Sequence, residues 1–135
     1  MGLSEDFAAK VVDAPAGLLG KTLRPLWHEA LARVEAEHRV GRGGADVARD
    51  IVVVMDAVVL AIYQRAVGQA QGTHALVALG GYGRSEMAPY SDVDLLFLFK
   101  KDQDKVPEFV SGVLNPLWDM GFEVGHSSRT LAEVA

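Results

Sequence analysis

The sequence contains no cysteine among its 135 residues, which excludes disulfides, thiolate metal sites and a cysteine nucleophile. This absence fits a reducing compartment, so the expected location is the cytoplasm. The sequence also lacks an excess of basic residues: 13 Lys and Arg face 18 Asp and Glu, for a net charge of -5. Because nucleic acids are bound through a basic face, this balance argues against a nucleic-acid partner.

Long hydrophobic runs are missing as well. The longest apolar stretch, Ile51 to Tyr63, is interrupted by Asp56, and it is far shorter than the roughly 20 residues of a membrane span. We therefore predict a core helix there and no membrane partner. The N-terminal residues MGLSEDFAAK show no basic segment followed by an apolar one, and Asp6 stands where a myristoylation signal has Ser or Thr. No export or lipid signal is expected.

Half of the residues are hydrophobic, and in two segments they recur at intervals of three and four, which predicts amphipathic helices. The first set is Leu19, Leu23, Leu26, Trp27, Ala30, Leu31 and Val34, and the second is Val47, Ile51, Val54, Met55, Val58, Ile62 and Ala66. The glycine-rich residues 41–44 should end the first helix, and Asp46 should cap the second. A loop this short predicts antiparallel neighbours.

The pattern changes after Gly72. HALVAL (74–79) and DVDLLFLF (92–99) read as buried strands, and FEVGHSSRT (122–130) reads as a third. Between the last two, Val110, Val113, Leu114, Leu117 and Trp118 predict a helix that closes at Gly121, with Trp118 in the core. This order predicts an α/β (α+β) fold with a small mixed sheet. We divide the chain into a helical segment, 1–72, and a partial catalytic domain, 73–135.

Three glycines, Gly80, Gly81 and Gly83, follow the first strand directly. Glycines let the backbone turn sharply and bring N–H groups close to an anionic ligand such as a phosphate. An ordinary turn is the alternative interpretation. Tyr82, inside this cluster, is expected to be a packing anchor.

Asp92 and Asp94 stand at positions i and i+2 of a predicted strand, so both carboxylates face the same way, roughly 6 to 7 Å apart at Cα. Such a pair suits Mg²⁺, which prefers carboxylate and phosphate oxygens. Alone, the pair could equally be two exposed acids at the start of a strand. A glycine turn on the adjacent element favours the metal and phosphate interpretation.

Residues 80–98, GGYGRSEMAPYSDVDLLFL, and 116–130, PLWDMGFEVGHSSRT, carry a family resemblance. The glycine pair and the DxD strand are similar to those of the DNA polymerase β type nucleotidyltransferase superfamily. Together the two segments closely resemble the N-terminal transferase domain of the bacterial PII uridylyltransferase and uridylyl-removing family. Ser85 departs from that pattern, which usually has glycine there.

The resemblance implies an Mg²⁺-dependent transfer of UMP from UTP to a tyrosine of the PII signalling protein. Asp92 and Asp94 would then be the catalytic metal ligands, and Gly80 and Gly81 would hold the triphosphate. Arg84 is a candidate for neutralising phosphate charge, with a surface ion pair to Glu86 as its alternative. Ser91 is a nucleotide-binding candidate whose simpler role is to shape the turn.

Two residues of the third strand are further candidates. His126 could contact substrate, although a single histidine in a strand is usually structural. Arg129 is a candidate phosphate group or a residue that closes the fold.

Enzymes of this superfamily generally use a third carboxylate, which in the uridylyltransferase pattern falls after the segment matching HSSRTLAE. The chain is therefore expected to be a fragment with little activity alone, unless a carboxylate such as Glu123 completes the site. Alternatives are an enzyme similar to glutamine synthetase adenylyltransferase, and a non-catalytic nucleotidyltransferase-like binding module or antitoxin. The choice between UTP and ATP and the oligomeric state stay open.

Overall fold

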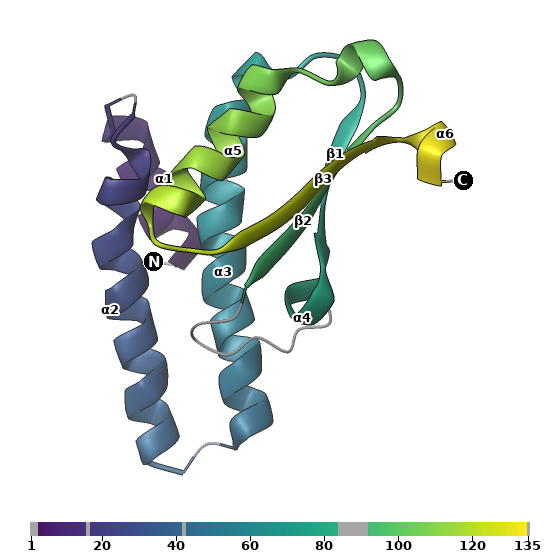
Figure 1. Cartoon of the computed structure of the whole chain (residues 1–135). Coiled ribbons are helices and arrows are strands. Elements are labelled where there is room, and N and C mark those ends of the chain that lie inside the picture. The colour runs from purple at the N-terminus through teal and green to yellow at the C-terminus, as the bar shows by residue number, and fades with distance from the viewer. Residues whose placement is uncertain (1–2, 16, 42, 84–91, 135) are drawn as a thin grey trace.

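The computed structural model describes residues 3–15, 17–41, 43–83 and 92–134. Its elements follow in the order α1 (Leu3–Asp13), α2 (Leu19–Arg39), α3 (Gly44–Ala66), η1 (Val67–Gln69), β1 (His74–Leu79), α4 (Gly80–Gly83), β2 (Val93–Phe99), η2 (Asp102–Asp104), α5 (Pro107–Asp119), β3 (Val124–Thr130) and α6 (Leu131–Val134). The long helices α2 and α3 lie side by side, joined by a short loop, as predicted (Figure 1).

The three strands form one mixed sheet in the order β1-β2-β3, which confirms the predicted fold class. β1 runs antiparallel to β2, and β2 runs parallel to β3 through a crossover that contains α5. The central strand alternates between buried and half-buried residues, because one of its faces meets the helices. Val93, Leu95, Phe97 and Phe99 form the buried face, and Asp94, Leu96 and Leu98 lie on the other.

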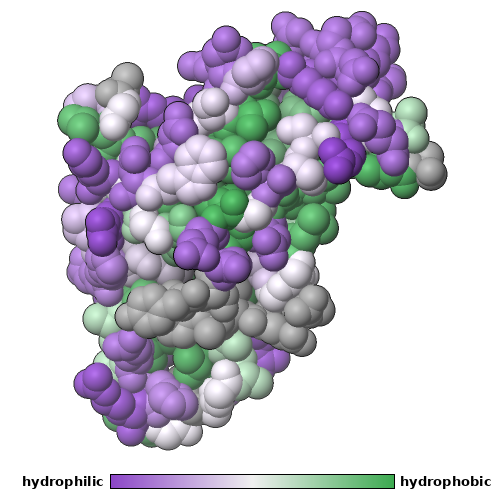
Figure 2. Space-filling model, in the orientation of Figure 1, coloured by the Kyte–Doolittle hydropathy of each residue, from purple (hydrophilic) through white to green (hydrophobic). Residues whose placement is uncertain are grey.

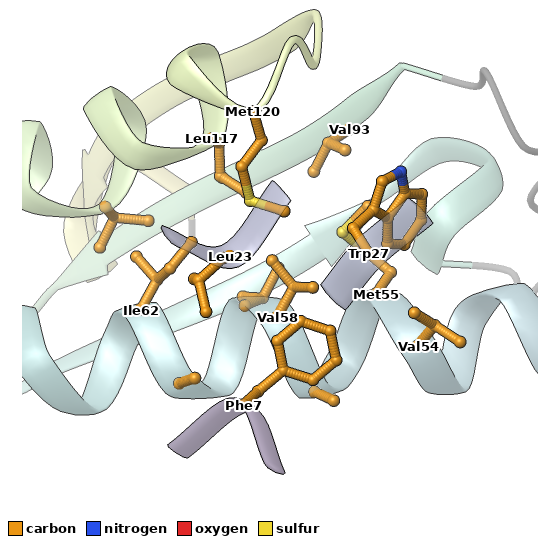
Figure 3. Packing of buried hydrophobic residues seen from close by; sticks show 14 of the residues in the cluster. Phe7, Leu23, Trp27, Val54, Met55, Val58, Ile62, Val93, Leu117 and Met120 are labelled. Carbon is orange, nitrogen blue, oxygen red and sulfur yellow. The ribbon is translucent and has the colours of Figure 1, made fainter. Parts of the chain in front are cut away.

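The core is one continuous hydrophobic cluster that joins the sheet to the helices. Figure 3 shows Phe7, Leu23, Val58, Val93 and Leu117 converging from α1, α2, α3, β2 and α5. All five side chains are almost completely buried. The structure therefore fixes the sheet, and any site on it, through packing that begins in the first helix.

An aromatic cluster supports the end of the sheet away from the glycine turn. The Phe109 ring lies in its centre, with ring centroids 4.9 to 6.3 Å from those of four neighbours. These neighbours are Tyr63, His74, Phe97 and Phe99. Edge-on contacts of this kind stabilise a core beyond the area that they bury.

Two features of the helices differ from the prediction. α3 begins at Gly44, so Asp46 lies in its first turn, makes no cap hydrogen bond and pairs with Arg49 at 2.6 Å. The predicted Asp46 cap is wrong because the helix starts two residues earlier. The periodicity also missed α1. Arg65 Nη1 of α3 donates to the carbonyl oxygen of Val11, in the last turn of α1, at 2.6 Å, and to that of Ala14, just beyond the helix, at 2.7 Å.

Trp118 corrects another expectation. α5 covers the predicted helix, but Trp118 is 46% exposed and is not part of the core. Its ring lies against that of His126, with centroids 6.0 Å apart. The buried stripe of α5 is narrower than the apolar pattern indicated, and Trp118 lies at its edge.

The outer surface is mostly charged along α2, which appears hydrophilic in Figure 2. Exposed Glu29 and Arg33 form an ion pair there, at 3.1 Å. In the described part of the chain, no helix has both the length and the apolarity needed to cross a membrane. The proposed division of the chain at residue 72 stays a prediction.

Candidate functional site

The glycine cluster forms a tight turn, α4, directly after β1. Gly80 has a φ of +62°, a conformation that a residue with a side chain rarely adopts. A Cβ at Gly83 would lie 2.6 Å from the carbonyl oxygen of Ala78, so the turn folds back closely onto β1. Gly81 is half-buried inside the same turn.

Asp94 lies where this turn meets the sheet. The register pairs it with Leu79 of β1 and with Gly125 of β3. A Cβ on Gly80 would lie 2.5 Å from Asp94 Oδ2, and a Cβ on Gly125 would overlap Oδ1. The carboxylate therefore occupies space that two glycines on opposite sides leave free.

Asp92 is exposed and immediately precedes β2. The chain beside it is fixed, because the backbone N–H of Val93 donates to the carbonyl oxygen of Glu123 at 2.9 Å. This bond brings Glu123, which is also exposed, next to the start of β2. The sequence did not reveal this proximity, because parallel pairing through α5 is not a local pattern.

The chemistry of this donor set fits a divalent cation. Two carboxylates two residues apart offer hard oxygen ligands, and Asp94 is half-buried while Asp92 is exposed. Within residues 3–15, 17–41, 43–83 and 92–134, no group of three or more His, Cys, Asp or Glu side chains is placed to hold a metal ion. Two carboxylates leave most of the coordination shell of such a cation to other oxygen ligands.

The structure describes some of the other predicted site residues and not others. Arg84 and Ser91 lie outside the described residues. His126 is exposed and lies on the helix-facing side of β3, against Trp118, so its position does not bring it together with Asp94. Arg129 shares the face of Asp94 and Gly125, and its Nη1 donates to the Ser128 carbonyl at 3.1 Å.

Tyr82 is buried, as its predicted role as a packing anchor requires, and its hydroxyl donates to Asp56 Oδ1 of α3 at 2.6 Å. Burial, together with the hydrogen bond to Asp56, raises the pKa of this phenol well above its usual value, so it stays protonated at neutral pH. Sequence reasoning missed Asp56 as a site residue. Its signal was present, since it is the one acid in the apolar stretch of α3.

A cavity of about 590 Å³ lies between α3 and β1 and reaches the glycine turn. Both Asp56 and Tyr82 line it, and so does a second polar pair, in which Tyr63 Oη lies 2.8 Å from His74 Nε2. The rest of the lining is mostly apolar. The turn thus meets the sheet on one side and an open space on the other.

A glycine turn, followed by two carboxylates at the start of the adjoining strand of a small mixed sheet, is the arrangement expected of a nucleotidyltransferase domain. The family described as "Nucleotidyltransferase domain" matches residues 60–124, which include the turn and both aspartates. The predicted resemblance is confirmed.

Its curated relatives narrow the comparison. A "Bifunctional uridylyltransferase/uridylyl-removing enzyme" of Phenylobacterium zucineum is 44% identical over 112 residues, covering 75% of this chain and 12% of the relative. The enzyme of the same description from Novosphingobium aromaticivorans is 39% identical over 127 residues, covering 92% of this chain and 14% of the relative. The one from Pseudomonas aeruginosa is 55% identical over 62 residues, covering 45% of this chain and 7% of the relative.

The chain therefore spans only a small part of the length of these relatives. No solved structure matches it significantly.

Proposed function

We propose that this chain supplies the metal-binding and phosphate-binding part of an enzyme that transfers UMP from UTP to a tyrosine of the PII protein. The observation that carries the proposal is the position of Asp94: its carboxylate lies between the glycine turn and β3, within 2.5 Å of the place a Gly80 Cβ would take. A phosphate received by the turn would lie beside the carboxylates that share a metal with it.

Each residue has a role in this proposal. The N–H groups of Gly80 and Gly81 bind the triphosphate, and Asp92 and Asp94 hold Mg²⁺. When bound, Mg²⁺ would neutralise phosphate charge and favour displacement of pyrophosphate. The tyrosine hydroxyl releases its proton to solvent as its oxygen forms the new bond to the α-phosphorus, and the bond between that phosphorus and pyrophosphate breaks. Arg84 and Ser91 are proposed to contact the nucleotide.

The names of the three relatives described above support uridylyl transfer over adenylyl transfer, since each carries the uridylyltransferase description. Because the described residues provide two carboxylates and no third acidic or histidine ligand grouped with them, we expect little transfer by this chain alone. We place the protein in the cytoplasm, where its nucleotide substrate is found.

Titration calorimetry with UTP and Mg²⁺ tests the proposal. Wild type should bind the nucleotide in a metal-dependent way, and Asp92→Asn with Asp94→Asn should abolish that dependence. Asp119→Asn, at an exposed aspartate on α5, is the matched control for lost charge. Metal-dependent binding that survives the double substitution would refute the site.

Transfer itself is tested with radiolabelled UTP and PII. We compare this chain with a longer one that continues as the relatives do, and expect transfer from the longer chain alone. Strong transfer by the 135-residue chain would mean that a carboxylate within it completes the site. Glu123→Gln, at the acid beside the start of β2, would then identify that carboxylate.

A further inference from the structure

The Gly80–Gly83 turn has little intrinsic rigidity. Three of its four residues are glycines, and glycine restricts the backbone less than any other residue. Tyr82 is its single residue with a side chain, and that side chain is 6% exposed. A fixed conformation of this turn must therefore come from contacts with the rest of the fold.

On one side, the contacts come from the sheet. Gly83 lies against the Ala78 carbonyl, and Gly80 lies against Asp94. On the other side, the Tyr82 hydroxyl donates to Asp56 of α3 at 2.6 Å. The Tyr82 ring also packs in the hydrophobic core cluster, whereas Asp56 is exposed beside the cavity between α3 and β1. The hydrogen bond is therefore the contact that ties the hydroxyl end of Tyr82 to α3.

We infer that Asp56 and Tyr82 are positioning residues, whose hydrogen bond holds the glycine turn in the conformation that receives phosphate. The inference rests on the proposed function. Neither side chain needs to touch the nucleotide. The bond joins the turn to α3, which belongs to the hydrophobic core, and so transmits the rigidity of that core to the backbone N–H groups.

Four variants separate this role from general stability. Tyr82→Phe and Asp56→Ala remove the donor and the acceptor, whereas Asp56→Asn keeps an acceptor oxygen. Tyr63→Phe is the matched control, because it removes a phenol hydroxyl on the same cavity that bonds His74 at 2.8 Å instead of the turn.

Two measurements are made on each variant: amide hydrogen exchange of residues 80–83 without nucleotide, and affinity for UTP with Mg²⁺. Tyr82→Phe and Asp56→Ala should speed exchange in the turn and weaken UTP binding by about tenfold, the effect expected for one hydrogen bond to a charged group. Asp56→Asn should restore most of both values, and Tyr63→Phe should change neither. The double variant Tyr82→Phe with Asp56→Ala should be no worse than either alone.

Unchanged exchange in the turn of Tyr82→Phe would overturn the inference, and so would an equal acceleration throughout β1, which indicates general loosening. Faster exchange with unchanged UTP affinity would also overturn it, provided that Asp94→Asn abolishes binding. If Asp94→Asn leaves UTP binding unchanged too, the proposed function is what fails. In that case, faster exchange confined to the turn still supports the hydrogen bond as its anchor.

Discussion

Substituting Gly80 by alanine tests most directly the close contact between the glycine turn and the Asp94 carboxylate. The new Cβ would lie 2.5 Å from Asp94 Oδ2, whereas real Cβ contacts are essentially never under 3.0 Å and rarely under 3.4 Å. The carboxylate must therefore move by about 0.5 to 0.9 Å, the difference between these distances. A shift near 1 Å at a reacting centre lowers the reaction rate by on the order of a hundredfold. Disturbing a residue that supports a metal ligand lowers metal affinity or activity by on the order of ten- to a hundredfold.

Gly80→Ala also forces alanine into a positive φ, which destabilises the fold by roughly 1 to 2 kcal/mol. Gly121→Ala is the control for this second effect, because Gly121 has a φ of +95° and a Cβ there meets nothing within 4 Å. Both variants should lose similar stability in urea, but Gly80→Ala alone should weaken metal-dependent UTP binding by ten- to a hundredfold. Equal UTP affinity in the two variants would refute the reasoning.

Three further predictions concern separate parts of the molecule. Gly125→Ala should also displace Asp94, with a UTP affinity at least tenfold lower by calorimetry and only a small change in unfolding free energy, since no positive φ is involved. The hydrogen bond from the Thr130 N–H, helped by Lys105, lowers the pKa of Glu133 to about 2. The ionised Glu133 carboxylate therefore stabilises the fold fully above about pH 4.5, the ordinary pKa of glutamate, and this stabilisation is lost as the pH falls toward 2. Thermal melts of Glu133→Gln should lack this acid-dependent loss of stability. Phe109→Ala should destabilise the fold by about 3 to 5 kcal/mol in urea, because its ring is buried at the centre of the aromatic cluster; a loss below about 1 kcal/mol would mean that the cluster is not a packing centre.

Much of the fold could be predicted because its signals are local. The apolar spacing predicted α2, α3 and α5, and the short apolar runs gave the three strands nearly at their observed bounds. α1 was missed because it is only 11 residues long, and two buried apolar residues one turn apart, Phe7 and Val11, are too few to show a period. Trp118 was placed in the core because spacing alone does not define how wide a buried stripe is.

The features of the candidate site also divide into those with a local signal in the sequence and those that depend on the fold. The glycine cluster predicted a turn that is tight, and the structure shows it. That the carboxylates of Asp92 and Asp94 face the same way stays a prediction, because β2 begins at Val93 and Asp92 precedes it. The role of Gly125 beside Asp94 could not be predicted, since it depends on the register of a parallel pair. Asp56 stood out as the one acid in its apolar stretch, but its contact with the turn could not be predicted, because only the fold brings α3 to the turn.

The register around Asp94 also bears on how the chain folds. Gly80 directly follows β1, and Asp94 lies on the antiparallel neighbour β2, whereas Gly125 arrives only after the crossover through α5. Closing a parallel crossover is a non-local step that is slow relative to local pairing. We therefore expect the space around the carboxylate to close late in folding, when β3 reaches the sheet, so that an intermediate with its helices formed would still lack the enclosed Asp94 carboxylate.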